Sequence, residues 1–518
     1  MRIISTLIFL ITLNSAQAGL FEDGMASLQR KDYVSAFNKF MDAAKNGDAR
    51  ANHNIGLMYM EGLGRSKNYK EAAHWFKIAA DKGLVDSQIN LGQFYRHGTG
   101  VEKNSIKALT LFKLAAKQGD FTAHYLIGVM NYNGDGIPQD YKEALRWFRF
   151  AAAEGNRDAQ QALGVMYAQG NGVVKNYQEA FQWHFKAAGQ GSVEAQYSLG
   201  VLYSKGRGVT ASHSEALHWF KLAAAQGYPD AQHNLAVLYS EGIGVERNQK
   251  EALRWFLSAA KKGVSEAQYR VGLFYYHGLD VPIDFKEASK WYQLAANQGN
   301  ESAQAFLGFM YANGQGVDRD YNAAAHWYEA AARQGSSVAQ SNLGLMLLTG
   351  EGVEKDYQKA YYWITSAANQ SDAEAQANLG FMFENGFGVE RSDSEAYRWY
   401  RAAALQGHSA SQYKLGIMYR EGTGISADFK QAADWYRLSA RQGVTEAQLS
   451  LSLMYVLGQG VREDLILAYM WSFIAATSED ADSITSRDRL ARVMTKNQIE
   501  QARRMALDCM ESNYRQCD

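Results

Sequence analysis

The chain has 518 residues, a length at which a single hydrophobic core is unusual and a division into domains or repeats is expected. Its 53 basic and 54 acidic residues give a net charge of -1, and no block of like charge stands out, which argues against a nucleic-acid-binding protein. A hydrophobic share of 47% and only three prolines exclude a disordered or collagen-like chain.

The first 18 residues have the layout of a secretory signal peptide. Arg2 supplies a short positive region, residues 3–13 are mostly apolar, and residues 16–18 read Ala-Gln-Ala, a small-x-small cleavage signal. The stretch is too short and too weakly apolar to span a bilayer, and a buried N-terminal helix is the alternative. We therefore expect cleavage after Ala18 and a periplasmic or secreted protein. No later stretch reaches 18 consecutive apolar residues, so we expect no transmembrane segment.

Residues 19–47 are expected to form an incomplete first repeat that caps the array. Lys39 stands where later repeats carry Trp, and a polar residue suits the exposed end of a repeat array. The small residues of this segment match the second helix of the later repeats at Ala36, Ala43, Ala44 and Gly47.

Residues 48–479 contain twelve copies of one unit of 36 residues. All eleven tryptophans share one register, at Trp75 and then every 36 residues from Trp147 to Trp471, with Leu111 at the position that lacks Trp. A period of this length indicates a solenoid or another repeat array. We interpret the Trp as the side chain that fills the space between helix layers.

The first half of each copy has the spacing of an amphipathic helix, as at Ala195, Leu199 and Tyr203. A small residue recurs in the middle of this helix. Because Gly there costs about 1 kcal/mol relative to Ala, its recurrence predicts close contact between helices. A Gln lies four residues before this central position in ten copies, as at Gln196, and we expect it to bond backbone between repeats. The central position is held by Gly56, Gly92, Gly128, Gly164, Gly200, Ala236, Gly272, Gly308, Gly344, Gly380, Gly416 and Ser452.

A glycine-rich loop joins the two halves of each copy. Glycine ends the first helix in all twelve copies, as at Gly206, and a second Gly follows two residues later in eleven, with Asp280 as the exception. A phosphate-binding loop would follow a strand and precede Lys-Ser or Lys-Thr, whereas this loop follows a predicted helix and lacks that pair.

The second helix opens with an N-cap residue in every copy. Eight copies carry Glu or Gln three residues after the cap, as at Glu143, which predicts a complete capping box. The N-cap residues are Asn68, Asn104, Asp140, Asn176, Ser212, Asn248, Asp284, Asp320, Asp356, Ser392, Asp428 and Asp464.

The combined pattern resembles the Sel1-like repeat, a relative of the tetratricopeptide repeat with a longer loop between its helices. It reads Ala-x3-Leu-Gly-x2-Tyr-x2-Gly-x-Gly-Val and then Ala-x2-Trp-x3-Ala-Ala, and one copy shows it in full between Ala303 and Ala332. The resemblance implies an all-α fold, a right-handed α-solenoid (superhelix) of about twelve helix-turn-helix repeats of 36 residues with N- and C-terminal caps. It also implies a role in protein binding.

Residues 480–518 are expected to form the C-terminal cap. Thr495 and Gln498 match a capping box that opens a helix over the last Trp layer. The only two cysteines, Cys509 and Cys517, form a close pair, and in an exported chain such a pair favours a disulfide. Free thiols are the alternative, whereas a zinc site would need four ligands and no His lies near.

No catalytic or metal-binding motif emerges. Cysteine-rich relatives within the family have been proposed to bind penicillin, and the Ser-x-x-Lys motif of such sites matches twice, at Ser258/Lys261 and Ser411/Lys414. Both matches fall where other copies hold unrelated residues, and Ser-Asp-Asn and Lys-Thr-Gly are absent, so we treat them as coincidental. The eleven histidines are scattered and form no His-Glu-x-x-His. We expect no catalytic residue, no metal and no cofactor.

A partner surface is expected on the first helices, which line the concave face in repeats of this kind. Positions that pack keep their residue in every copy, whereas positions that face a partner are free to differ. Two positions differ in this way, and they carry Tyr, His and Arg, the residue types that anchor interfaces. Ordinary solvated variation is the alternative. The candidates are His53, Tyr125, Tyr197, His233, Tyr269 and Tyr413, three residues before the central position, and Arg96, Tyr132, Tyr276 and Arg420, four residues after it.

These features predict an exported, non-enzymatic scaffold or adaptor that binds envelope or host proteins through the concave face of the solenoid. One alternative is a cell-wall or β-lactam hydrolase with penicillin-binding activity, as proposed for the cysteine-rich relatives, whose cysteine pairs in each repeat this chain lacks. Another is an endoplasmic-reticulum adaptor of the Sel1 type. The predicted partners are proteins rather than nucleic acids, and the sequence does not identify them.

Overall fold

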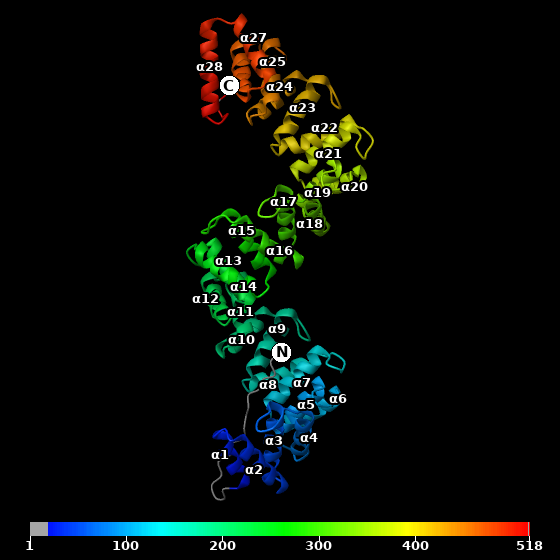
Figure 1. The fold of residues 1–518 in the computed structure, drawn as a ribbon, viewed down its shortest axis with the longest axis vertical. Coiled ribbons are helices and arrows are strands. Elements are labelled where there is room, and N and C mark those ends of the chain that lie inside the picture. Colours follow the sequence, from blue (N-terminus) through cyan, green and yellow to red (C-terminus); the bar gives the residue numbers. More distant parts are fainter. Residues whose placement is uncertain (1–18, 516, 518) are drawn as a thin grey trace. The chain divides into compact units, whose positions relative to one another are not determined.

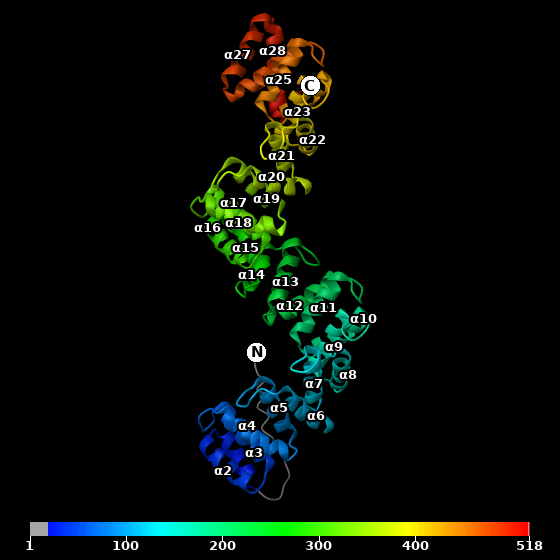
Figure 2. The ribbon, with the colours of Figure 1, turned by 90° about the vertical axis from the view of Figure 1, so that its right-hand side faces the viewer.

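The computed structural model describes residues 19–515 and residue 517, so the predicted signal peptide at 1–18 lies outside the described residues. Every regular element within those ranges is a helix, and no strand occurs among them (Figures 1 and 2). The chain divides into two compact units, Met1–Ser258 and Ala259–Asp518. Within each unit consecutive helices pack against one another, which confirms the predicted all-α array of helix pairs.

In the first unit the odd-numbered helices from α3 onward are the first helices of repeats, and the even-numbered ones are the second helices. α14 (Gln249–Ala260) crosses from the first unit into the second. The other helices of this unit are α1 (Leu20–Gln29), α2 (Tyr33–Lys45), α3 (Ala49–Glu61), α4 (Tyr69–Asp81), α5 (Val85–His97), α6 (Ser105–Lys117), α7 (Phe121–Asn133), α8 (Tyr141–Ala153), α9 (Arg157–Gln169), α10 (Tyr177–Gly189), α11 (Val193–Lys205), α12 (His213–Ala225) and α13 (Pro229–Glu241).

The second unit continues the same alternation and ends in two cap helices. Among the described residues, no helix of the chain is long and apolar enough to cross a membrane. The helices of this unit are α15 (Ser265–His277), α16 (Phe285–Asn297), α17 (Glu301–Asn313), α18 (Tyr321–Gln334), α19 (Ser337–Thr349), α20 (Tyr357–Asn369), α21 (Ala373–Asn385), α22 (Asp393–Leu405), α23 (Ser409–Glu421), α24 (Phe429–Ala440), α25 (Thr445–Leu457), α26 (Leu465–Ala475), the 3-10 turn η1 (Ala476–Ser478), α27 (Ala481–Val493) and α28 (Lys496–Glu511).

In the ten repeats whose central residue is glycine, that glycine lies against a side chain of the second helix. In the repeat of α17 and α18, a side-chain carbon built on Gly308 would lie only 2.7 Å from Cδ1 of Tyr328, far inside the distance at which carbon atoms touch. The same contact joins Gly200 to Phe220 in the first unit, where the separation would be 2.5 Å. Because the ring occupies the space of the missing side chain, the predicted close contact between helices is confirmed.

The buried ring that meets the glycine is the residue that follows the repeated Trp. The Trp itself packs against the core shared with the preceding repeat, as Trp327 does against the cluster that contains Tyr292 and Leu307, so its interpretation as a filler between layers is confirmed. Trp291 is half-buried, whereas its neighbour Tyr292 is fully buried. Ten of the eleven Trp are half-buried, and only Trp471 is fully buried, under the C-terminal cap. Successive residues on a helix point about 100° apart, so only one of the two side chains can face the glycine. The residues at this ring position are Phe76, Phe112, Phe148, His184, Phe220, Phe256, Tyr292, Tyr328, Ile364, Tyr400, Tyr436 and Ser472.

The predicted N-cap residues all accept a backbone N–H from the first turn of their second helix. The reciprocal half of the predicted capping box does not form in these helices as far as they are described. The N-cap N–H is already bonded to the first helix, as where the N–H of Asp284 donates to the carbonyl oxygen of Tyr275 at 2.9 Å. The Glu of the box then bonds elsewhere, and Glu143 accepts from Trp147 Nε1 at 2.7 Å.

The repeated Gln joins consecutive repeats through the backbone, as predicted. Nε2 of Gln304 donates to the carbonyl oxygen of Ala296, in the preceding second helix, at 3.1 Å. Its Oε1 accepts from Nε2 of Gln334 at 2.8 Å, and that Nε2 also lies 3.0 Å from the carbonyl oxygen of Gly299. A buried amide bonded at both ends fixes each first helix between two second helices.

The N-terminal pair keeps the glycine–ring contact although its loop is shorter. A side-chain carbon on Gly24 of α1 would lie 2.6 Å from the ring of Phe40 in α2, the residue that follows Lys39. The last repeat instead carries Ser452 and Ser472, whose hydroxyl oxygens lie 2.7 Å apart and hydrogen bond. The two helices of the last repeat therefore approach closely through a hydrogen bond in place of the glycine–ring contact.

The C-terminal cap consists of α27 and α28, which both pack on α26. Thr495 and Gln498 form the complete capping box predicted at the start of α28. Cys509 and Cys517 are joined in a disulfide, and both cysteines are buried. They lie in the same core cluster as Trp471, so the cap covers the Trp that would otherwise end the array half-exposed.

We predict that Tyr292→Ala destabilises its repeat by about 3–5 kcal/mol, the usual cost of emptying a large buried ring site. Trp291→Ala should cost less than half as much, because that side chain is only half-buried. Tyr292→Phe should be neutral or stabilising, since the buried Tyr292 hydroxyl has no hydrogen-bond partner among the described residues. Native-state hydrogen exchange in α15–α18 measures these local free energies. A larger effect of Trp291→Ala than of Tyr292→Ala would contradict the assignment of the buried ring.

Candidate protein-binding surface

The first helices of three successive repeats in the second unit expose an apolar side chain at the same position. Phe309 of α17, Leu345 of α19 and Phe381 of α21 directly follow the central glycine and are 41%, 37% and 39% exposed. α19 contacts both α17 and α21, so the three side chains belong to neighbouring helices. We call Phe309, Leu345 and Phe381 the apolar row.

The helices that carry the apolar row have few charges. α19 contains no charged residue, and α17 contains only Glu301, in its first turn. On α21, Glu384 lies 2.9 Å from Nζ of Lys414 and accepts a hydrogen bond from the Tyr400 hydroxyl at 2.6 Å. Burial and this carboxylate raise the pKa of Tyr400, so its hydroxyl keeps its proton and donates. Large apolar side chains exposed on neighbouring helices with few charges are a candidate interaction site.

The predicted contact residues three positions before the central glycine lie in a half-buried layer. Each packs on the buried ring of its own repeat, with ring centroids 5.5 to 5.9 Å apart. Five of the six keep an edge at the surface. His53 is the exception, because it is 1% exposed and its Nδ1 lies 2.8 Å from Oγ of Ser87. The structure therefore removes His53 from the candidate contact residues, since a partner could reach it only by opening the repeat.

The predicted contact residues four positions after the central glycine are bonded to neighbours in the array. The hydroxyl of Tyr276 donates to Oε1 of Gln315 at 2.9 Å, and Tyr132 bonds to its neighbours through its hydroxyl as well. Arg96 and Arg420 are ion-paired. Local pairing accounts for the residue types at this position, and their contact with a partner stays a prediction.

The sequence alone did not point to the apolar row, because its position is apolar in nearly every copy and so matched the pattern of packing. The sequence feature that could have indicated the row is the size of its side chains, because the row holds two Phe and a Leu where earlier copies mostly hold Val. The twelve residues are Leu57, Gln93, Val129, Val165, Val201, Val237, Leu273, Phe309, Leu345, Phe381, Ile417 and Leu453.

The first unit has a hollow between the first helices α11 and α13, with a volume of about 380 Å³. Phe220, Val237 and Ile243 supply apolar surface, and Lys205 supplies a charge. Tyr197, one of the predicted contact residues, also lines this hollow. Apolar walls with a few polar groups are typical of a binding site. We call it the α11–α13 hollow.

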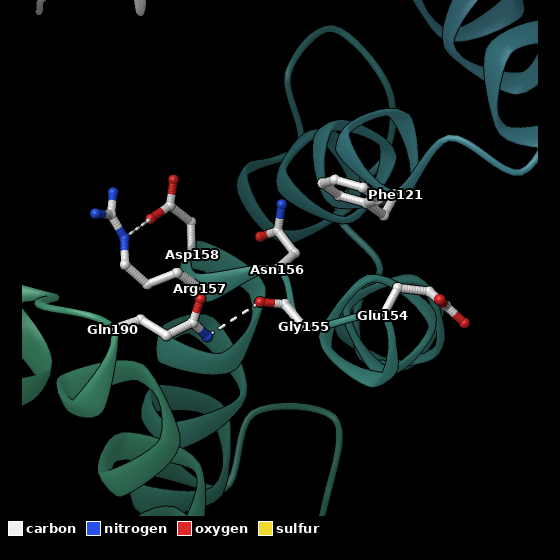
Figure 3. A pocket seen from close by; sticks show the side chains of 7 residues that line it. All are labelled: Phe121, Glu154, Gly155, Asn156, Arg157, Asp158 and Gln190. Carbon is white, nitrogen blue, oxygen red and sulfur yellow. Dashed lines mark hydrogen bonds and ion pairs between the residues drawn. The ribbon is translucent and has the colours of Figure 1, made fainter.

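A second hollow, of about 370 Å³, opens at the helix ends beside Phe121 (Figure 3). Nε2 of Gln190 donates to the carbonyl oxygen of Gly155 at 3.0 Å, and Nε of Arg157 lies 3.0 Å from a carboxylate oxygen of Asp158. The same glutamine-to-carbonyl bond recurs in other repeats. The amide of Gln190 is used in the joint between repeats, and the guanidinium of Arg157 is already paired. This hollow therefore offers few free polar groups to a ligand.

The two Ser-x-x-Lys matches do not form a catalytic site. Oγ of Ser411 lies 2.8 Å from Nδ1 of His408, and Nε2 of His408 lies 3.2 Å from Glu374, an order of groups that resembles a catalytic triad. Ser411 is only 1% exposed, however, and Nδ1 also accepts its backbone N–H, as an N-cap residue does. Lys414 is paired with a glutamate, and the hydroxyl of Ser258 donates to a carbonyl of its own helix. A buried hydroxyl cannot reach a substrate in solution and so cannot attack it. Ser411 and His408 take part in a helix cap, and Ser258 and Lys414 make ordinary helix contacts.

Two histidines are almost wholly enclosed. Burial lowers the pKa of both His53 and His184 to about 4. His184 occupies the ring position against Gly164, and its Nδ1 lies 2.8 Å from Oε1 of Gln161. Throughout the described part of the chain, no three His, Cys, Asp or Glu side chains are grouped so that they could hold a metal ion. These imidazoles act as packing residues.

A family model described as Sel1 repeat matches the chain at residues 49–84, 85–120, 122–156, 157–192, 193–228, 229–264, 265–300, 301–336, 337–372, 373–408, 409–444 and 445–480. The chain belongs to the Sel1 repeat family. Helix-pair repeats of this class typically serve as scaffolds for protein–protein interaction, and they present extended binding surfaces rather than catalytic clefts.

Two solved structures illustrate the likeness. A protective antigen present in uropathogenic Escherichia coli strains, described as displaying an SLR (Sel1-like repeat) fold, is 31% identical, with a TM-score of 0.72 and coverage of 92% of this chain and 96% of that chain. A Sel1 repeat protein from Oxalobacter formigenes is 32% identical over 66% of this chain and 99% of that chain, with a TM-score of 0.48. No curated protein matches this chain. The similarity to the first structure extends over nearly the whole chain and confirms the repeat fold.

We predict that acid weakens the first unit around α9 and α10. The pKa of His184 in the folded chain, about 4, lies below the unfolded value near 6.5, so the folded state favours the neutral ring. Its contribution to stability is complete above about pH 6.5 and is lost as the pH falls toward 4, by about 2 kcal/mol at pH 5.

The substitution His184→Phe places the commonest ring at this position and should remove much of the acid sensitivity. Hydrogen exchange in α9 and α10 at pH 7.5 and pH 5, corrected for intrinsic rates, measures the effect. His218→Phe, on the exposed face of α12, is the matched control and should leave the pH dependence as it is. Equal acid sensitivity in the chain with and without His184 would contradict the prediction.

Proposed function

We propose that this chain is an exported, non-enzymatic scaffold that binds envelope or host proteins through the exposed face of its first helices. The observation that carries the proposal is the apolar row, three large side chains exposed on neighbouring helices that bear little charge. Large apolar and aromatic anchors in an uncharged centre supply most of the binding energy of protein interfaces. A partner that covers the row would remove this surface from water.

Two observations support an exported location. The first 18 residues have the layout of a cleavable signal peptide. The 31% identical relative is described as a protective antigen of uropathogenic strains, and a protein of that kind meets the host. Host proteins are therefore proposed as partners beside proteins of the envelope.

A role in binding also fits the chemistry of the described surface better than hydrolysis does. The one serine that lies in a triad-like order, Ser411, is buried and takes part in capping α23. Ser204 and His213 both line the α11–α13 hollow, but no hydrogen bond joins them among the described residues, so they are not arranged as a nucleophile and its base. The geometry thus favours a scaffold over the hydrolase alternative.

We predict that a photo-crosslinking amino acid placed at Phe309, Leu345 or Phe381 captures a discrete partner protein in intact cells of the source organism or in contact with its host. The adducts should appear in the exported fraction, because the proposal places the chain outside the cytoplasm. Mass spectrometry of each fraction identifies both the partner and its compartment.

Matched controls come from the second helices. Leu294 and Leu438 are 47% and 45% exposed, at least as much as the apolar row, and they lie on α16 and α24. The same crosslinker at these positions should give no specific adduct. Equal capture from both sets of positions, or adducts confined to the cytoplasmic fraction, would refute the proposal.

A further inference from the structure

The α11–α13 hollow is bordered by a position that carries a large ring in two other repeats. Four residues after the central glycine, α11 carries Ser204, whereas α7 and α15 carry Tyr132 and Tyr276. The ring of Tyr276 packs with Phe306 of the next first helix, with centroids 5.7 Å apart. Removing such a ring leaves a space over the joint between two first helices. The same position is small in the repeats of α9, α13 and α17, at Ala168, Ser240 and Ala312, so a small residue here is one condition for the hollow and not its full cause.

The walls of this hollow are apolar. Val201 and Val237 follow the central positions of α11 and α13, and Phe220 is the buried ring of the repeat. Ile243, from the loop after α13, closes one side. Its volume of about 380 Å³ lies in the range of sites that take a small ligand or a large side chain.

Among the polar residues that line the hollow, Lys205 carries a positive charge and none is acidic. Lys205 is exposed and makes no ion pair with any described residue. His213, Ser204 and Asn234 complete the polar lining. Burial raises the pKa of Tyr197, which also bonds with Asn234, so its hydroxyl is neutral at physiological pH. An anionic group placed beside Lys205 would gain an ion pair that the chain itself does not provide.

We propose that the α11–α13 hollow binds a segment of a partner protein in which a large apolar side chain, such as Phe or Leu, stands next to Asp or Glu. The apolar side chain enters the hollow beside Ser204, and the neighbouring carboxylate pairs with Lys205 at the edge. This inference rests on the proposed binding role of the first helices and adds the chemistry of one partner segment. The charge complementarity at Lys205 sets an acidic segment apart from a neutral or basic one.

The test uses the full chain and three peptides observed by ligand-detected NMR. The probe is acetyl-Gly-Asp-Phe-Glu-Gly-amide. One control replaces its Phe by Ala, and the other replaces its two acids by Lys. The probe should bind with an affinity near millimolar, as a small ligand with one anchor does. Both controls should bind at least tenfold more weakly, and added salt should weaken the probe because one contact is ionic.

Three variants locate the site. Ser204→Tyr fills the hollow with a residue that two other repeats already hold at this position, and it should abolish binding. Two other repeats carry glutamate at the Lys205 position, as Glu61 and Glu241. Lys205→Glu should therefore be tolerated, and it should weaken binding at least tenfold without filling the hollow. Ala168→Tyr makes the same change as Ser204→Tyr in the preceding repeat and should leave binding unchanged.

Several outcomes would overturn the inference. Equal binding of the basic peptide would remove the role of Lys205, and probe binding that survives both Ser204→Tyr and Lys205→Glu would place the site elsewhere. Binding of free 3-phenylpropionate but not of the probe would show a small-molecule site instead of a peptide site. The peptides report on residues 197–243 alone, so their failure leaves the crosslinking test of the apolar row standing, and failure of that test leaves peptide binding measurable.

Discussion

Ten of the twelve repeats depend on a contact in which a side chain of the second helix lies against the bare backbone of a glycine in the first helix. Gly308 and Tyr328 show why the glycine is needed, since any Cβ would lie 2.7 Å from the ring. The glycine weakens the helix by about 1 kcal/mol, and the buried ring more than offsets this loss. Most repeats use Phe or Tyr, while Ile364 and the Ser452–Ser472 pair achieve the same approach by other means.

This contact also determines which residues can face a partner. With the central glycine turned inward, the next residue of the first helix points outward, about 100° away. A change there alters the surface and leaves the contact intact. Large residues after the glycine form the apolar row, and the small residue Ser204, three positions farther on, lines the α11–α13 hollow.

Much of the fold could be predicted from the sequence because the signals were local and repeated. The glycine that ends each first helix, the N-cap residues and the Gln between repeats each depend on a few bonds that residue type decides, as at Gly206, Asp320 and Gln304. The buried ring position was not predicted because the regular spacing of the Trp drew attention to that residue. The more deeply buried side chain is the one that follows the Trp, as Tyr292 follows Trp291. The capping box failed at the second helices because their N-cap N–H is bonded to a carbonyl of the first helix, a tertiary contact.

The candidate surface was harder to predict because a position can vary between copies for two reasons: contact with a partner, or bonding to a different neighbour within the array. Arg96 and Tyr276 vary in type with the neighbour that they bond, so variation there does not single out a partner contact. His53 is enclosed by the next repeat, which no property of the single copy reveals. Exposure depends on how one repeat lies on the next, and the apolar row became visible only once that packing was known.

The most direct test of the account is a double-mutant cycle between Gly308→Ala and Tyr328→Ala, followed by hydrogen exchange in α17 and α18. If the ring occupies the space of the missing side chain, Gly308→Ala should destabilise the intact repeat by about 1–3 kcal/mol. The same change should be neutral or stabilising once Tyr328 is Ala, because only the gain in helix propensity remains. The account predicts a coupling of at least about 1 kcal/mol, and additivity within about 0.5 kcal/mol would contradict it.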